Sequence, residues 1–301
     1  MAERLSFHDE IRANKIKSWL LISVVIIFMV LLAYFIGIIY DPALVPVFLF
    51  FGGVIVIVQA LVSYYQGDKI ILKIMGAKEA KKIEHQHLIN VVDGLSLASG
   101  LPMPKVYVID SPDMNAFATG RDPEHASVAV TTGLLNNLNR QELEGVIAHE
   151  MSHIANYDIR FATIVSIMVG AVSIIASIVL RSMFWSGGGR SRSNKGGGGI
   201  ILLIIGIAFM ILAPIAVKLV QLSISRKREY LADSTGAKLT RYPNGLANAL
   251  EKISKTNQNR MKVPEAVSHL FFTNPVSRKN IAGLFSTHPP IEERIAKLRA
   301  M

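Results

Sequence analysis

The sequence predicts a membrane protein of the α+β class. It should combine four transmembrane or membrane-embedded helices with a water-soluble unit that is mostly helical and contains a small sheet. Two observations predict this class. Of the 301 residues, 51% are apolar, and much of this apolar content lies in four long runs without a charged residue. Between and after the runs, shorter segments show the apolar spacing of helices or the alternation of strands.

Each of the four runs is close to the ~20 residues that a helix needs to cross a hydrocarbon core of about 30 Å. Aromatic residues border the first two runs, as they do at the headgroup level of membrane helices. Buried helices of a soluble protein are the alternative, and four uninterrupted runs disfavour it. The runs are Trp19–Tyr40, Ala43–Tyr65, Phe161–Leu180 and Ile200–Val217.

The first run is expected to be a retained anchor, because it exceeds the core of about 7–15 residues found in signal peptides and no small-residue cleavage site follows it. Four Lys or Arg residues precede this run, whereas the connection Asp41–Pro46 has none. By the positive-inside rule, the N-terminus is therefore cytoplasmic and the chain returns to the cytoplasm after Tyr65.

The net charge of +10 comes from scattered or membrane-flanking Lys and Arg. The sequence has no basic stripe with interleaved aromatic residues, which disfavours a nucleic-acid partner. Contact with the anionic lipid of a bilayer is the simpler interpretation. Cysteine is absent, which excludes disulfides and a thiolate zinc site.

The chain is expected to divide into four parts. Residues 1–65 hold the N-terminal segment and two membrane helices, residues 66–160 the first part of the soluble unit, residues 161–220 a membrane-embedded hairpin, and residues 221–301 the second part. The Gly-rich loop 181–199 inside the hairpin contains four Lys or Arg residues and no acid. Because the positive-inside rule resists an outside location for this loop, the hairpin either crosses the bilayer or only dips into it.

Within the soluble unit, apolar spacing predicts the secondary structure. We expect helices at His85–Ser99 and Gln141–Tyr157, strands at Val106–Ile109, Asn115–Thr119 and Ser127–Thr132, turns at Gly120–His125 and Gly133–Leu138, and a small helical subdomain at Ala237–Met301 with loops around Pro264, Asn274–Pro275 and His288–Pro290.

The central motif is His149-Glu150-Met151-Ser152-His153. Histidines at i and i+4 lie on one face of a helix, so both imidazoles can reach one zinc ion. Glu150 can then act as the general base that takes a proton from a zinc-activated water and passes it to the leaving amine. Two histidines on a helix face without a metal are the alternative.

A third ligand has to come from elsewhere in the chain. The extended metzincin motif would need Gly at position 156 and His at position 159, where this chain has Asn156 and Ile159. The gluzincin arrangement instead takes a Glu from a downstream helix, and Glu229 fits. The third ligand thus has a candidate on a separate helix.

Asp233 lies on the same helix face as Glu229. It can accept a hydrogen bond from the ring N–H of a ligand histidine that does not face the metal. The alternative is that Glu229 and Asp233 form a solvated acidic face. An antiparallel hairpin between the two motifs would bring them together.

These motifs resemble those of the HtpX-type membrane zinc metalloproteases, which are related to the CAAX prenyl proteases. The likeness covers most of the chain and includes Asn156 and Asp158 after the first motif, the segments Asn115–Gly120 and Thr287–Pro290, and the two pairs of membrane runs. It implies a zinc-dependent endopeptidase in a bacterial-type plasma membrane, with its active site in the cytoplasm, that degrades misfolded or unfolded membrane proteins under stress.

Two further roles are considered, and the resemblance favours the first. Ala116, Phe117, Ala118 and Thr119 are expected to form an edge strand that holds an extended peptide, although an ordinary core strand is equally consistent with the residues. His288 can stabilise the oxyanion, although a structural histidine in a proline-bound turn is the stronger interpretation. One zinc ion per chain is expected. A non-catalytic metal-binding scaffold and a prenyl-peptide processing protease are the alternative functions, and the sequence does not fix the oligomeric state.

Overall fold

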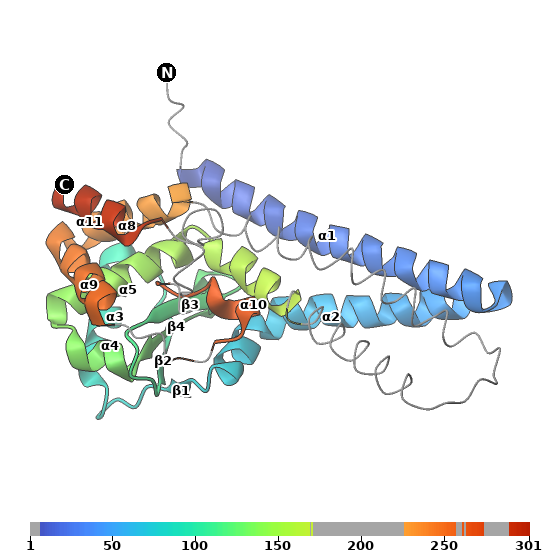
Figure 1. Ribbon diagram of the computed structural model, residues 1–301, viewed down its shortest axis with the longest axis horizontal. Helices are drawn as coiled ribbons and strands as arrows, with labels where there is room; N and C mark the ends of the chain where they lie inside the picture. The colour runs from blue at the N-terminus through green and yellow to red at the C-terminus, as the bar shows by residue number, and fades with distance from the viewer. Residues whose placement is uncertain (1–6, 169, 171–225, 257–260, 262, 274–288) are drawn as a thin grey trace, which may run out of the picture.

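The computed structural model describes residues 7–168, 170, 226–256, 261, 263–273 and 289–301. In these residues the chain is mostly helical with a small mixed sheet, as predicted (Figure 1). The elements are α1 (Phe7–Tyr40), η1 (Pro42–Leu44), α2 (Val45–Ile74), β1 (Lys78–Glu79), α3 (Gln86–Ser99), β2 (Lys105–Ile109), β3 (Ala116–Gly120), η2 (Pro123–His125), β4 (Ala126–Thr131), α4 (Thr132–Asn137), α5 (Arg140–Ala155), α8 (Arg226–Thr240), α9 (Pro243–Thr256), α10 (Glu265–Ser268) and α11 (Ile291–Arg299).

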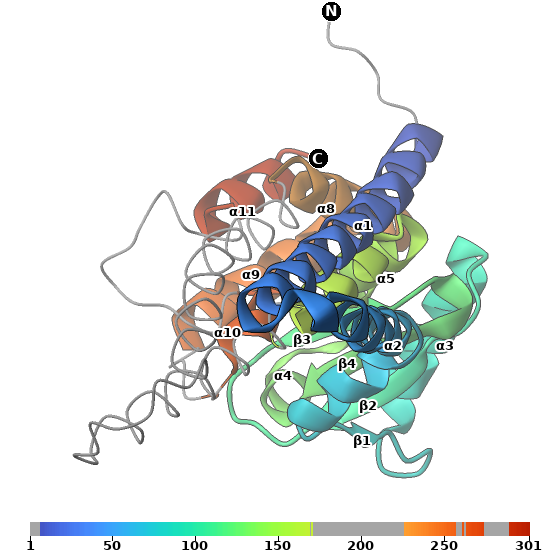
Figure 2. The ribbon, with the colours of Figure 1, turned by 90° about the vertical axis from the view of Figure 1, so that its right-hand side faces the viewer.

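Helices α1 and α2 lie side by side and form an arm that projects from a body made of the sheet and the remaining helices (Figures 1 and 2). The backbones approach closely where Gly52 faces Ala33, since a Cβ on Gly52 would lie 2.7 Å from the Cβ of Ala33. In the part of the chain that the structure describes, one helical stretch, Pro42–Ile74, is long and apolar enough to cross a bilayer. Its apolar side chains are largely exposed, with Phe50 at 66%.

The sheet has four strands in the order β1-β2-β4-β3. Strands β3 and β4 form an antiparallel hairpin around the predicted turn, with Ala118 opposite Val128, while β2 and β4 run parallel. The short strand β1 was not predicted; both of its residues are exposed, so they show no apolar pattern. Strand β3 lies at the end of the sheet opposite β1.

The alternation of side chains divides the core between the two faces of the sheet. Ala118 and Val128 point to the face that is covered by α3 and α5, and they belong to the main core. Phe117 and Ala129 point to the other face, where the C-terminal end of α2 and the segment around Phe271 cover them. The helix that carries both histidines therefore packs directly on the edge strand β3.

Two glycines let the neighbouring helices approach α5. A Cβ on Gly236 of α8 would lie 3.0 Å from the backbone nitrogen of His149, and a Cβ on Gly145 of α5 would lie 2.6 Å from that of Leu246 on α9. Because any larger side chain at these positions would separate the helices, Gly236 lets the Glu229 helix pack against the histidine helix, and Gly145 lets α9 do so.

One predicted turn is wrong. Gly133–Leu138 was expected to form a turn, but Thr132–Asn137 forms the helix α4. The side chain of Thr131 accepts a hydrogen bond from the backbone N–H of Leu134 and caps this helix, and Leu134 is buried. The capping bond and the burial of Leu134 stabilise this short helix.

Candidate metal centre

Helix α5 carries three of the predicted site residues into the core. A reciprocal capping box between Asn139 and Glu142 fixes its N-terminus. The side chain of His149 is 1% exposed and that of His153 is 16% exposed, and Glu150 is buried between them. The helix is thus buried on most sides, and its two imidazoles lie one turn apart on one face.

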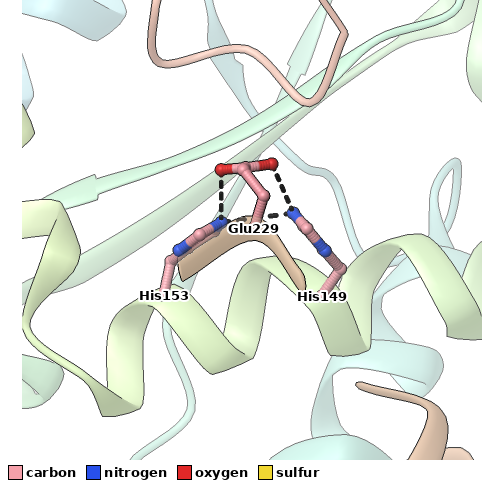
Figure 3. A group of neighbouring side chains, drawn as sticks. All are labelled: His149, His153 and Glu229. Carbon is pink, nitrogen blue, oxygen red and sulfur yellow. Dashed lines mark hydrogen bonds and ion pairs between the residues drawn. The ribbon is translucent and has the colours of Figure 1, made fainter. Parts of the chain in front are cut away.

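The carboxylate of Glu229 lies opposite the two imidazoles and comes from α8 (Figure 3). The Nε2 atoms of His149 and His153 are 3.2 Å apart. The Glu229 oxygens lie 3.7 Å from Nε2 of His149 and 3.5 Å from Nε2 of His153. Donor atoms on a tetrahedral zinc ion are about 3.3 Å apart, given bonds of ~2.0–2.1 Å. These three side chains could hold a metal ion.

Each histidine is oriented by a second carboxylate. Nδ1 of His149 lies 2.9 Å from Oδ1 of Asp233. Nδ1 of His153 lies 2.9 Å from Oδ2 of Asp158. A carboxylate accepts, so each Nδ1 donates a proton and each Nε2 is left to face Glu229. This is the arrangement that fixes the tautomer and orientation of metal-binding histidines.

Asp158 reaches His153 because the chain turns sharply after α5. Tyr157 has a φ of 59°, in the left-handed region that a tyrosine rarely adopts. The ring of Tyr157 lies between two cations, with Lys15 Nζ 4.2 Å and the Arg160 guanidinium 5.0 Å from its centroid. These cation–π contacts offset part of the energetic cost of the strained backbone at Tyr157. The turn brings Asp158 within hydrogen-bond distance of His153.

Each orienting carboxylate in turn binds a buried arginine. Arg294 of α11, which is 1% exposed, donates from Nε and Nη2 to the two oxygens of Asp233 at 2.9 and 2.7 Å. Arg228 of α8 donates from Nη1 to Oδ1 of Asp158 at 3.0 Å. Both histidines are therefore held by the same kind of relay, from arginine to aspartate to imidazole.

The charges around the histidines balance only with two additional positive charges. Four carboxylates are buried here, and two buried arginines face them; the carboxylates belong to Glu150, Asp158, Glu229 and Asp233. Buried charges in proteins are paired or bind metals. A divalent ion between His149, His153 and Glu229 would supply both missing charges, so the residues fit a metal of this charge.

Without a metal, protons take this role. Burial lowers the pKa of His149 to about 4, so this imidazole is neutral at pH 7. Burial also acts to lower the pKa of His153, but the hydrogen bond to Asp158 and the charge of Glu229 raise it to about 9. Burial raises the pKa of Glu150 to about 7. Protons on His153 and Glu150 therefore compensate the charge of the metal-free site.

Glu150 connects the site to the edge of the sheet. A hydrogen bond from the backbone of Ala118 reaches its carboxylate. The backbone N–H of Thr131 donates to Asn115, so in this antiparallel ladder Phe117 and Thr119 are the hydrogen-bonded positions. The N–H and carbonyl of Ala118 therefore point away from β4, and its backbone reaches Glu150. A hollow beside Ala118 is lined by the two histidines, Glu150 and Glu229, and also by His269 and Phe271.

The profile of peptidase family M48 matches residues 82–301. The chain belongs to peptidase family M48. The match includes both motifs, the two orienting aspartates and the two buried arginines. It confirms the resemblance inferred from the sequence and identifies the chain as a membrane metalloprotease, a hydrolase that cleaves peptide bonds.

Relatives and solved structures agree with this M48 assignment. The protease HtpX homolog of Dictyoglomus turgidum is 42% identical over 296 residues, which cover 98% of this chain and 95% of the relative. That of Tropheryma whipplei (strain Twist) is 48% identical over 242 residues, or 80% and 81% of the two chains. The crystal structure of S. mikatae Ste24p matches with a TM-score of 0.50 at 21% sequence identity. The match covers 95% of this chain and 65% of Ste24p, and it supports a shared fold.

Sequence reasoning named five residues that the structure places together: His149, Glu150, His153, Glu229 and Asp233. His288, the segment Asn274–Pro275 and the loop 181–199 lie outside the described residues. The sequence did not reveal the role of Asp158, Arg228 or Arg294. Asp158 follows a helix end at i+5 from His153, which is not a helix-face spacing, and no motif singles out the two arginines.

Proposed function

We propose that this M48 chain is a zinc-dependent endopeptidase that cleaves misfolded or unfolded membrane proteins in quality control and the stress response. We place it in a bacterial-type plasma membrane, with the N-terminus and the active site facing the cytoplasm. The observation that carries the catalytic part is the convergence of His149, His153 and Glu229 with Glu150 beside them. The similarity to proteases of the HtpX group supports a membrane-associated substrate.

In this proposal, Nε2 of His149, Nε2 of His153 and the Glu229 carboxylate hold one Zn²⁺. The bound ion supplies Lewis-acid polarisation of the scissile carbonyl and of water. Asp233 and Asp158 keep both imidazoles in the tautomer that presents Nε2. Support comes from the spacing of the donor atoms and from the four buried carboxylates, which the two buried arginines neutralise only in part.

Glu150 acts as the general base and then as the general acid. A general base has to lie within reach of the proton that it removes, and Glu150 is buried beside the three side chains that would hold the ion. Its carboxylate lies on the same helix as both histidines, one residue from His149. It can accept a proton from the attacking water and deliver it to the leaving amine.

The edge strand Ala116–Thr119 holds the substrate in an extended conformation. The outward-facing backbone of Ala118 lies directly beside Glu150, while the outward carbonyl of Ala116 already accepts from the backbone N–H of Phe272. In this proposal a peptide pairs with the carbonyl oxygen of Ala118 and with its N–H, which contacts the Glu150 carboxylate in the free site. Main-chain pairing of this kind binds a peptide whatever its side chains, which suits an enzyme that acts on unfolded chains.

Four membrane or membrane-embedded helices, in residues 1–65 and 161–220, anchor this unit. The two parts of the protease unit are residues 66–160 and 221–301. The exposed apolar side chains of α1 and α2 support the first pair. Residues 161–168 are helical and start the third run directly beside the site. The active site would then lie at the membrane surface, where the ends of misfolded membrane proteins emerge.

The function is tested by incubating the purified full-length protein in detergent with an unfolded, casein-like substrate. We expect cleavage that a zinc chelator stops and that added Zn²⁺ restores. Retention of one zinc per chain without cleavage would favour the metal-binding scaffold instead. Cleavage that is confined to a lipidated C-terminal peptide would favour a prenyl-peptide processing enzyme.

A further inference from the structure

Asn14 lies on α1, far from both motifs in sequence and outside the residues 82–301 that match the family. Its side chain is nevertheless 2% exposed and contacts the metal centre. It lies five residues before Trp19, where the first apolar run begins. A buried asparagine at the start of an apolar helix loses its hydrogen bonds to water. Its burial destabilises the fold unless the amide forms hydrogen bonds within the protein.

Both ends of the Asn14 amide have partners. Nδ2 donates to Oδ1 of Asp158 at 2.7 Å and to the backbone oxygen of Asn156 at 3.1 Å. Oδ1 accepts from Nη1 of Arg228 at 3.4 Å. The three side chains form a closed cluster in which Asn14 contacts both members of the relay behind His153.

The two oxygens of Asp158 have separate roles. Oδ2 accepts from His153, whereas Oδ1 accepts from Asn14 and from Arg228. Loss of the amide would leave Oδ1 to a single arginine and allow the carboxylate to rotate. A rotated Asp158 no longer fixes Nδ1 of His153, and outer partners of this kind control how well a histidine binds metal.

A neutral amide suits this position. Arg228 and Arg294, together with a divalent ion, already balance the four buried carboxylates. A third cation on Asp158 would disturb that balance and compete with His153 for its negative charge. An amide donates a hydrogen bond without adding charge.

We infer that Asn14 is a positioning residue of the metal site: the first membrane helix holds Asp158, and through it the ligand His153, in the orientation that binds zinc. The inference rests on the proposed zinc site. It makes α1 a part of the catalytic unit as well as an anchor. A simple packing contact between α1 and the body is the competing explanation.

The experiment measures zinc affinity by competition with a chromogenic chelator, using full-length protein in detergent. Asn14→Ala and the nearly isosteric Asn14→Leu both remove the amide, and the second variant preserves packing if the first does not fold. The matched control is Ser18→Ala, one turn along the same helix, because Ser18 is 1% exposed and its hydroxyl donates to the backbone oxygen of Asn14. Each variant is also made in an Asp158→Asn background.

We expect both Asn14 variants to bind zinc about tenfold more weakly, at the low end of the range for outer partners of a metal ligand. Ser18→Ala should stay within about twofold of wild type. In the Asp158→Asn background, the effect of the Asn14 substitutions should fall below about twofold, because the residue through which they act is already altered.

An equal loss of affinity in both backgrounds would show that Asn14 acts by packing alone, and unchanged affinity in the wild-type background would also overturn the inference. Failure of the wild-type protein itself to bind zinc would instead overturn the proposed function.

Discussion

Arg294 and Asp233 form a buried bidentate pair that joins the C-terminal helix α11 to the site helix α8. The guanidinium donates to both carboxylate oxygens at 2.9 and 2.7 Å. Burial acts to raise the pKa of Asp233, but the charge and hydrogen bonds of Arg294 outweigh it and lower this pKa to about 2. Because Asp233 also accepts from His149, the last helix of the chain contributes to the orientation of a metal ligand.

Arg294→Ala should therefore weaken both folding and metal binding. Removing one partner of a buried ion pair costs about 3–5 kcal/mol, since it leaves the other charge uncompensated. Arg294→Lys should recover only part of this loss, because an ammonium cannot form the bidentate contact. Chemical denaturation and zinc content are the measurements. Arg299→Ala is the control: this exposed arginine of the same helix bonds to Asn244 and Asn248 of α9, so its loss should lower stability without changing the zinc content.

His149→Ala and Glu229→Ala should each lose bound zinc, because two of the three donors cannot complete the site. Metal analysis of the purified variants is the measurement. The matched control is His87→Ala, an exposed histidine on α3, which should retain the wild-type zinc content. A variant with normal zinc content would remove its residue from the set of ligands.

Zinc binding should release protons, chiefly from His153. Its raised pKa of about 9 means that the metal-free imidazole holds its proton below that pH, and a metal needs the neutral form. At pH 8 Glu150, with a pKa of about 7, is already mostly ionised. Zinc affinity should thus rise with pH between 7 and 9 by about tenfold per pH unit.

Titration calorimetry in buffers of different ionisation enthalpy counts the released protons. In Asp158→Asn, the partner that raises the pKa of His153 loses its charge, so we expect about one proton fewer at pH 8 than for wild type. Equal proton release by the two proteins would contradict the assignment of the proton to His153.

Much of this architecture follows from local sequence patterns. The helix Gln86–Ser99, the hairpin of β3 and β4 and the histidine helix all have the apolar spacing that predicts them. The pairing of His149 and His153 follows from helix geometry alone. Glu229 and Asp233 are predictable because two carboxylates at i and i+4 share one face of a downstream helix. One of them can then bind the metal while the other accepts a hydrogen bond from a ligand imidazole.

The remaining parts of the site depend on tertiary packing. Asp158 acts only because Tyr157 adopts a left-handed backbone, and Arg294 only because α11 packs against α8. Neither feature has a local pattern in the sequence. The strand order is equally non-local. Strand β4 lies between β2 and β3 in the sheet, so β2 pairs with β4 although β3 lies between these two strands in the sequence.

Ala118→Pro tests the substrate-binding edge. Proline is tolerated in edge strands and would remove the N–H that faces Glu150, while the pairing of Phe117 and Thr119 with β4 would remain. A main-chain hydrogen bond contributes about 0.5–1.5 kcal/mol, so kcat/KM for an unfolded substrate should fall by about two- to tenfold. Zinc content should stay at the wild-type level. An unchanged kcat/KM would argue against pairing of the substrate with this strand.

The most direct test of the account compares wild type and Glu150→Gln for zinc content and casein cleavage in one preparation. The substitution keeps the size of the side chain and removes the base, while His149, His153 and Glu229 are untouched. We expect full zinc content and no detectable cleavage. Cleavage at the wild-type rate by a zinc-loaded Glu150→Gln protein would contradict the central claim.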